Sequence, residues 1–415
     1  MDDVRRVITG RVIRGFADGF VSVLLAQYLT DLGFSPLRVG AIITGTLLGS
    51  AALTLVFGLG AHRTTLGRLL VWACVLMAAT GIGFAATTAF WPLLIVAIVG
   101  TLNPSAGDVS VFLPTEQAFM ADRVEGHART RLYAVYNLGG VFAGALGALA
   151  SGLPERIANA TDWRLTSVER LGFVLYAAAA VAILVLYRSI PAREPRSAPV
   201  DTAEATGPPP EKRPALGASR RIVLELAALF SLDSAGSGFV VTSLLVLWLH
   251  LRFDLSRGAT AGVFFTAGLL GACSQLLAPV LAKRIGLIRT MVFTHLPANA
   301  LLALAAFAPN GTVAIGLLLV RALFAQMDVP ARQAFVMSVV PPHERAAASS
   351  ITNVPRSLAS ATTPLIAGAL LSHSTFGWPL LIAGATKFSY DLLLLVMHRN
   401  TPEAEVVAPG VRSGP

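Results

Sequence analysis

Ionisable residues stand inside long apolar stretches of this chain, where a charge needs a functional or a structural reason. The clearest are Asp18 and Asp233, each beside small and aromatic neighbours such as Phe16 and Gly236. A charged side chain at the centre of a bilayer costs about 2.5–3.5 kcal/mol, so one that persists usually faces a cavity or a partner. Such a carboxyl group can bind a proton or a cationic solute. The alternative is a structural acid that pairs with a base, which for Asp18 is Arg14, four residues away.

Two further apolar runs contain polar residues where a solute could be recognised. The residues are Asn103 and Asp108 in the first run, and Arg321, Gln326 and Asp328 in the second. Asp328 and Arg332 are four residues apart, so a charge ladder within one helix is the alternative interpretation. Lys387 and Asp391 have the same spacing, and for them we expect a structural pair.

The elements that position these residues must be membrane helices. The chain has 415 residues, of which 54% are hydrophobic and only 13% charged, and its mean hydropathy is +0.68. So much apolar surface cannot be hidden in one water-soluble core. At about 20 residues per crossing, the chain has room for about a dozen transmembrane helices with short loops.

The apolar runs predict twelve transmembrane helices in two sets of six. We expect them near residues 12–32, 38–60, 69–88, 91–118, 131–152 and 170–188, then 222–250, 258–281, 287–307, 312–338, 347–371 and 376–397. The predicted organisation is a six-helix bundle over 1–190, a cytoplasmic linker over 191–220, a second bundle over 221–399 and a flexible tail over 400–415. The fold class is therefore an all-α membrane protein of two pseudo-symmetric bundles.

The basic residues predict how the helices are oriented. Loops on the side of the amino terminus, with the linker and the tail, carry 21 Lys and Arg, whereas loops on the other side carry six. Cytoplasmic loops are enriched in these residues, so both termini are expected in the cytoplasm and the protein in the cytoplasmic membrane. The net charge of +9 then indicates orientation and not nucleic-acid binding.

An internal repeat relates the two sets of helices. The segment Pro114 to Phe119 and the segment Pro330 to Phe335 match at an offset of 216 residues, which also superposes Asn137 on Asn353. A weaker match relates the first and seventh helices, each with an acid followed by Gly-Phe-Val. Two six-helix repeats around a midplane site are typical of secondary transporters.

The loop after the second helix reads Gly60-Ala61-His62-Arg63-Thr64-Thr65-Leu66-Gly67-Arg68. Its two glycines and final arginine match the signature of the major facilitator superfamily, although threonines replace its acid and first arginine. The segment Leu281 to Gly286 is similar, and Gly140, Gly144 and Gly147 resemble that family's glycine-rich antiporter motif, although these glycines equally suit close helix packing. The chain resembles this family over its whole length, which implies that helices 1, 4, 7 and 10 line a central cavity.

The repeat also suggests a gate. Glu116 and Arg332 occupy equivalent helix ends with opposite charges, and we expect them to approach when the cytoplasmic side closes, with Arg356 as a competing partner for Glu116. The alternative is a pair of solvated charges that contribute little.

These features predict a secondary transporter that moves a small solute by alternating access. The first hypothesis is proton-coupled efflux, in which Asp18, Asp108 or Asp233 exchanges a proton for solute. The alternatives are an importer of a small, anionic metabolite that binds Arg321, and a receptor or scaffold that has lost transport. No nucleotide-binding, hydrolase or metal-ligand motif is present in the sequence, so we expect no enzyme, no cofactor and no metal site. The expected partners are solute, protons and membrane lipid, without nucleic acid, and we expect a monomer.

Overall fold

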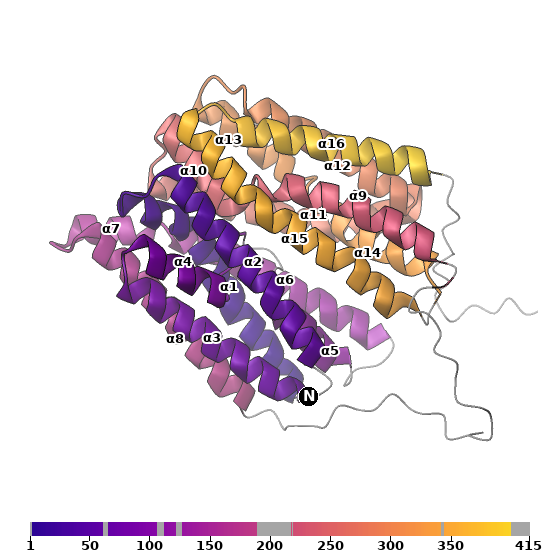
Figure 1. Ribbon diagram of the computed structural model, residues 1–415, viewed down its shortest axis with the longest axis horizontal. Coiled ribbons are helices and arrows are strands. Elements are labelled where there is room, and N and C mark those ends of the chain that lie inside the picture. The colour runs from indigo at the N-terminus through magenta and orange to yellow at the C-terminus, as the bar shows by residue number, and fades with distance from the viewer. Residues whose placement is uncertain are drawn as a thin grey trace, which may run out of the picture.

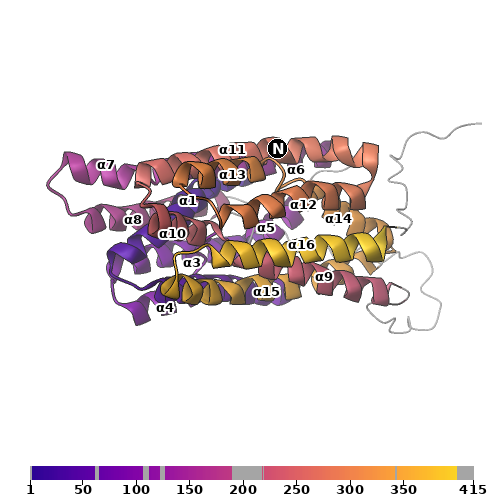
Figure 2. The ribbon, with the colours of Figure 1, turned by 90° about the horizontal axis from the view of Figure 1, so that it is seen from above.

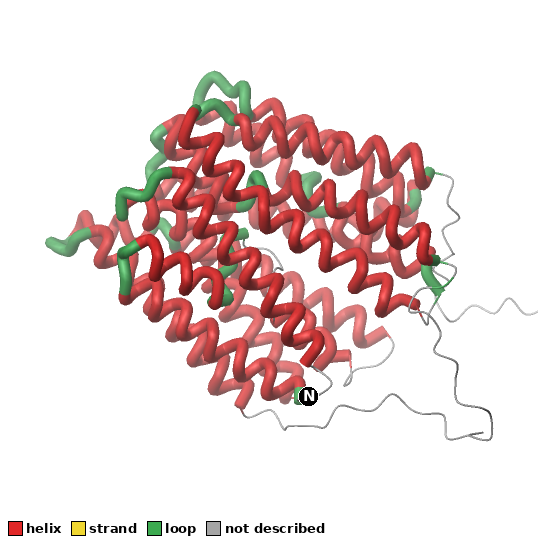
Figure 3. Tube along the Cα trace, viewed as in Figure 1, coloured by secondary structure: helices red, strands yellow, loops and turns green. Residues whose placement is uncertain are grey.

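The computed structural model describes residues 2–60, 65–105, 112–121, 127–188, 217, 219–341 and 344–399, and within these ranges the chain forms helices and no strands (Figure 3). Most of the predicted linker and the predicted tail lie outside them. The helices form two bundles, α1–α8 and α9–α16, which lie against each other with most helices along one direction (Figures 1 and 2). The predicted all-helical fold with two bundles is confirmed.

The first bundle consists of α1 (Asp2–Asp31), α2 (Pro36–Gly60), α3 (Leu66–Ala86), α4 (Phe90–Val99), α5 (Phe112–Ala121), α6 (His127–Ala150), α7 (Leu153–Ala160) and α8 (Leu165–Arg188). The second bundle consists of α9 (Arg220–Gly238), α10 (Thr242–Phe253), α11 (Arg257–Ile285), α12 (Leu287–Ala305), α13 (Gly311–Ala322), α14 (Asp328–Val339), α15 (Arg345–His373) and α16 (Trp378–His398).

These helices account for twelve crossings of a membrane. Within the described ranges, nine segments are long and apolar enough to cross, of which one combines α9 with α10 and another extends from α6 through α7. Two more crossings combine the shorter apolar helices α4 and α13 with α5 and α14, and the more polar α15 completes the set. The helix α7, between the fifth and sixth crossings, was not predicted from the sequence.

Large apolar side chains on the outside of the bundles fit a lipid environment. Trp91 is 70% exposed and Val396 is 72% exposed, and many other Leu, Val and Ile side chains are similarly uncovered. In water this surface would be costly, whereas hydrocarbon chains solvate it.

Three crossings are interrupted near their middle. The fourth loses its helix after Val99, the seventh between Gly238 and Thr242, and the tenth between Ala322 and Asp328. The fourth and tenth crossings are equivalent in the repeat, so both members of this pair are interrupted. Interrupted helices near the midplane expose backbone groups and helix ends that can contact a solute.

Small residues let α1 lie against α6 within the first bundle. A Cβ atom added at Gly15 or Gly19 would collide with the carbonyl oxygen of Gly140 or Gly144. The corresponding helices of the second bundle, α9 and α15, meet in the same way, because a Cβ at Gly238 would collide with the carbonyl of Ser360. The glycines of α6 therefore serve close packing.

The two bundles also approach each other closely at two places. Gly40 of α2 faces Pro364 and Gly368 of α15, and Gly268 of α11 faces Ala145 of α6, where an added Cβ would lie 2.9 Å from the alanine Cβ. We call the end of the molecule where α1 starts and α16 finishes the terminal end. The other end of the helices is called the opposite end.

Candidate functional site

A buried ion pair joins the first and fourth crossings inside the first bundle. Arg14 of α1 donates from Nη1 and Nη2 to the two carboxylate oxygens of Glu116 in α5, at 2.5 and 2.9 Å. Tyr187 of α8 donates to Glu116 at 2.5 Å, and Tyr136 of α6 donates to the other oxygen. Arg14 is 1% and Glu116 0% exposed, so the pair is fully removed from solvent. Side chains from α1, α5, α6 and α8 meet in this hydrogen-bonded group.

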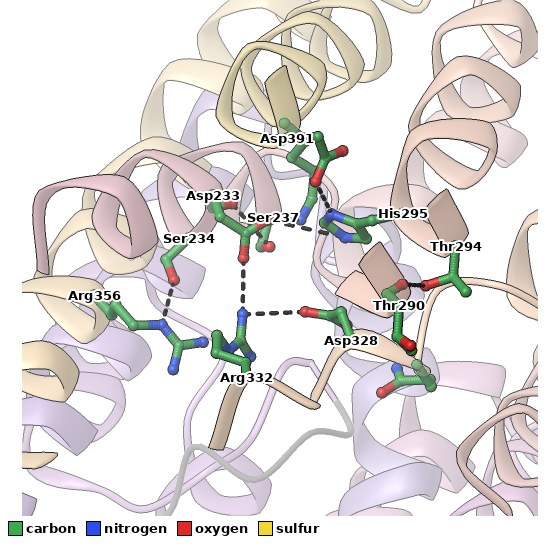
Figure 4. Close-up of polar contacts among 12 residues, drawn as sticks. Asp233, Ser234, Ser237, Thr290, Thr294, His295, Asp328, Arg332, Arg356 and Asp391 are labelled. Atoms are coloured by element: carbon green, nitrogen blue, oxygen red, sulfur yellow. Dashed lines mark hydrogen bonds and ion pairs between the residues drawn. The ribbon is translucent and has the colours of Figure 1, made fainter. Parts of the chain in front are cut away.

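A larger buried cluster in the second bundle is centred on Asp233 of α9 (Figure 4). Its Oδ1 accepts from Lys387 Nζ at 2.6 Å and its Oδ2 accepts from Arg332 Nη1 at 3.2 Å. His295 Nε2 lies 3.9 Å from the same carboxylate, and Arg332 also contacts Asp328 at 3.2 Å. One carboxylate thus holds basic side chains from α12, α14 and α16.

The cluster continues from His295 to α16. His295 Nδ1 lies 3.0 Å from Asp391 Oδ1, and Asn299 donates to Asp391 Oδ2 at 2.8 Å. The prediction that Lys387 and Asp391 pair within one helix is therefore wrong. Lys387 binds a residue of α9, and Asp391 binds residues of α12. This arrangement could not be predicted from the sequence, because only the fold brings α9, α12 and α16 together.

The two clusters correspond to each other in the repeat. Aligning Gly19-Phe20-Val21 with Gly238-Phe239-Val240, at an offset of 219, places Arg14 on Asp233, and the offset of 216 places Glu116 on Arg332. The equivalent contacts of Gly19 with Gly144 and of Gly238 with Ser360 obey the same two offsets. Both bundles therefore bind a charge on their first helix to a charge on their fourth, with the signs reversed.

The direct contact that we expected between Glu116 and Arg332 does not occur in this structure. Each charge is already neutralised inside its own bundle, by Arg14 and by Asp233. Arg356 does not bind Glu116 either, because its Nε donates to Ser234 at 3.0 Å and its Nη1 to Asn353 at 3.2 Å.

The other predicted residues lie in different settings. Asp18 is buried in α1 near Tyr176. Asn103 is buried beside the break of the fourth crossing, where its Oδ1 accepts from the backbone N–H and the hydroxyl of Ser105 at 3.1 and 2.8 Å. Asp108 lies outside the described residues.

In the tenth crossing, Gln326 and Arg321 flank the break. Gln275 of α11 donates to Gln326 Oε1 at 3.4 Å, and Asp328 is held by Arg332 as the charge-ladder interpretation predicted. Arg321 lies in the last turn of α13, and its buried Nε has no hydrogen-bond partner in the described part of the chain.

The polar contacts described here between the bundles lie at the opposite end or between that end and the middle of the molecule. Arg257, at the start of α11, donates to Glu169 of α8 and to Asp31 of α1. Nearer the middle, Ser243 of α10 donates to the carbonyl oxygen of Ser22 at 2.6 Å and of Pro104 at 3.1 Å. One arginine therefore fastens the second bundle to two acids of the first, which sequence reasoning missed because both acids lie near helix ends, next to polar loops.

Within the described part of the chain, no group of three or more His, Cys, Asp or Glu side chains could hold a metal ion. A model of the Major Facilitator Superfamily matches residues 7–325 of the chain. The chain belongs to this superfamily. Its members are transporters rather than enzymes, so the two bundles are the two halves of a transporter fold, and the protein is a multi-pass membrane protein.

Comparison with individual proteins gives the same fold. An uncharacterized membrane protein of Saccharomyces cerevisiae, YJR124C, is 24% identical over 95% of this chain and 94% of its own. The xylose transporter XylE of E. coli in an inward open conformation superposes with a TM-score of 0.74, at 15% identity, over 97% of this chain and 98% of that chain. The nucleoside transporter NupG superposes with a TM-score of 0.68, at 12% identity, over 96% and 99%.

Proposed function

We propose that this member of the superfamily is a proton-coupled secondary transporter that moves a small solute across the cytoplasmic membrane by alternating access. The observation that carries the coupling is the Asp233 carboxylate, which is buried and lies within 4.0 Å of Lys387, Arg332 and His295. These three basic side chains come from three other helices, α16, α14 and α12.

A proton on Asp233 would remove the charge that holds these cations together. Its contacts with α12, α14 and α16 would weaken at once, so protonation would change the relative stability of two arrangements of the second bundle. A ligand shifts a conformational equilibrium only through its different affinity for the two states, and a proton bound at a shared carboxylate meets that requirement.

The arrangement of the bundles supports a state that is open towards the terminal end. The bonds of Arg257 and Ser243 close the opposite end, whereas Glu116 and Arg332 at the terminal end bind within their own bundles. The excess of Lys and Arg in the terminal loops supports a cytoplasmic terminal end. The described conformation would then be inward-facing.

Efflux of a small toxicant is the direction that the sequence favours, and import of an anionic metabolite is the second candidate. The observation in favour of the second is Arg321, whose buried Nε has no partner. Net solute movement measured in both directions across the membrane distinguishes the two candidates.

The test is transport by the purified protein in proteoliposomes, with a panel of labelled toxicants and metabolites and an imposed pH gradient. The wild-type protein should exchange one solute across the membrane at equal pH, and a gradient should drive its net movement. Asp233→Asn should retain exchange and lose the response to the gradient. The matched control is Asp254→Asn, because the Asp254 side chain is 98% exposed in the turn after α10.

Two outcomes would contradict the proposal. Exchange without any response of the wild-type protein to the gradient would exclude proton coupling, and a full response in Asp233→Asn would exclude Asp233 as the coupling group. The parallel variant Asp18→Asn tests whether Asp18, another buried acid, is the coupling group instead of Asp233.

A further inference from the structure

Basic side chains outnumber carboxylates around Asp233. The described basic groups there are Lys387 on α16, Arg332 on α14, Arg356 on α15 and Arg321 on α13, and the carboxylates are Asp233, Asp328 on α14 and Asp391 on α16. The remaining titratable groups are His295 on α12 and Tyr390 on α16. Leaving His295 aside, the cluster holds four basic side chains and three carboxylates.

The pairing pattern identifies which cations are left over. Lys387 and Arg332 bind Asp233, Arg332 also binds Asp328, and Asp391 is occupied by His295 and Asn299. These contacts use all three carboxylates. Arg321 and Arg356 therefore sense Asp233 electrostatically, and neither pairs with a carboxylate among the described residues.

Arg321 has the less satisfied guanidinium. It lies in the last turn of α13, next to the break in the tenth crossing, and its Nε is buried without an acceptor. The end of a helix favours a cation, but it supplies only a partial charge. A buried donor without a partner is costly, so an acceptor that arrives with a ligand would be bound favourably there.

Arg356 has only uncharged partners, the hydroxyl of Ser234 and the amide oxygen of Asn353, and it lies near the like charge of Arg332 (Figure 4). The repeat places Gly140 of the first bundle opposite Arg356, and Ser105 opposite Arg321. Both surplus cations are therefore specific to the second bundle and are not part of the packing that the two bundles share.

We propose that Arg321 and Arg356 bind the anionic group of the transported solute, a carboxylate or a phosphate. This inference rests on the proposed transport function and names its substrate class. An anion beside Asp233 balances the extra positive charge, and a guanidinium offers paired donors to two oxygens of such a group.

The charge balance also sets the mode of coupling. A proton on Asp233 removes one negative charge from the cluster and leaves more positive charge for the anion. Binding of proton and anion is then mutually favourable, and by linkage each strengthens the other by the same factor. Proton and anion then travel in the same direction, which corresponds to the import candidate and not to efflux by proton exchange.

The test measures binding to the purified protein in detergent, without any gradient. Probes are lactate, succinate, glycerol 3-phosphate and inorganic phosphate, with lactamide, succinamide and glycerol as neutral analogues, and the readout is the melting temperature as a function of probe concentration. At least one anion should stabilise the protein while its neutral analogue does not. Arg321→Gln and Arg356→Gln should each weaken that binding at least tenfold. Arg252→Gln is the matched control, because Arg252 lies near the opposite end and donates to the carbonyls of Thr375 and Ala308.

A second readout is proton uptake in a weakly buffered solution with a pH-sensitive dye. Anion binding to the wild-type protein should take up protons, and binding to Asp233→Asn should not. Repeating the titration in nanodiscs with and without phosphatidylglycerol separates a soluble anion from a lipid headgroup, which would stabilise the protein without any added probe.

The inference is overturned if no anion stabilises the protein, if neutral analogues act equally well, if phosphatidylglycerol alone accounts for the effect, or if both arginine variants bind like the wild type. None of these results depends on proton-driven transport, so the coupling proposal for Asp233 would be judged separately.

Discussion

Glu116 and Arg332 stand at equivalent positions of the two bundles, and each binds an opposite charge on the first helix of its own bundle, Arg14 in one and Asp233 in the other. The two pairs share geometry and burial but not sign. A substitution at Glu116 or Arg332 therefore acts first on the ion pair inside its own bundle.

Glu116→Gln should destabilise the protein by about 3–5 kcal/mol, because it leaves the fully buried Arg14 guanidinium without a counter-charge. The measurement is thermal stability of the detergent-solubilised protein. The control is Glu225→Gln, whose partner Arg221 is 91% exposed, and there we expect no measurable change. An equal effect of the two substitutions would show that the Arg14 contact contributes nothing special.

Exchanging the charges, with Glu116→Arg and Arg332→Glu together, should abolish folding or transport. In the exchanged protein, an arginine would face Arg14 and a glutamate would face Asp233, so both buried sites would hold like charges. The readouts are yield of monodisperse protein and solute exchange. If the double variant transports while each single variant fails, the direct gate between Glu116 and Arg332 that the sequence suggested would be supported instead.

Arg257→Gln should shift the protein towards a state open at the opposite end, because it breaks the link between α11 and the acids Glu169 and Asp31. The reporter is Ser22→Cys in a background without Cys74 and Cys273, since Ser22 is buried under Ser243 in the closed arrangement. Maleimide labelling should rise several-fold. Arg252→Gln serves as the control, and unchanged labelling in Arg257→Gln would mean that this link does not hold the opposite end closed.

Gly19→Ala should destabilise the protein, because the new methyl group would overlap the carbonyl of Gly144 and force α1 away from α6. Gly262→Ala, inside α11, meets open space and should be neutral or slightly stabilising. Thermal stability of the two variants measures the difference. If Gly19→Ala is as stable as Gly262→Ala, the close approach of α1 and α6 is not required for stability.

Hydropathy and the Pro114/Pro330 match were sufficient to predict the helical fold and the two bundles, because lipid imposes length and apolarity on every crossing. The same reasoning identified Asp233, Arg332 and Glu116 as exceptional. Their partners could not be predicted, because ion pairs such as Arg14 with Glu116 join residues about a hundred positions apart and depend on which face of each helix turns inward. The register of the first and seventh helices was also misleading: matching the acids paired Asp18 with Asp233, whereas the Gly-Phe-Val segments and the helix contacts place Arg14 opposite Asp233.

The reversed signs of the two pairs have an evolutionary consequence. If one ancestral half was duplicated, one copy exchanged a base on its first helix for an acid and an acid on its fourth for a base, or the reverse. Either single replacement leaves two like charges in a site without water, which is strongly unfavourable. The route between the two versions must have passed through an uncharged intermediate or two nearly simultaneous changes. Because each pair lies wholly inside its own bundle, this barrier acts within one half and leaves the charges of the other half unaffected.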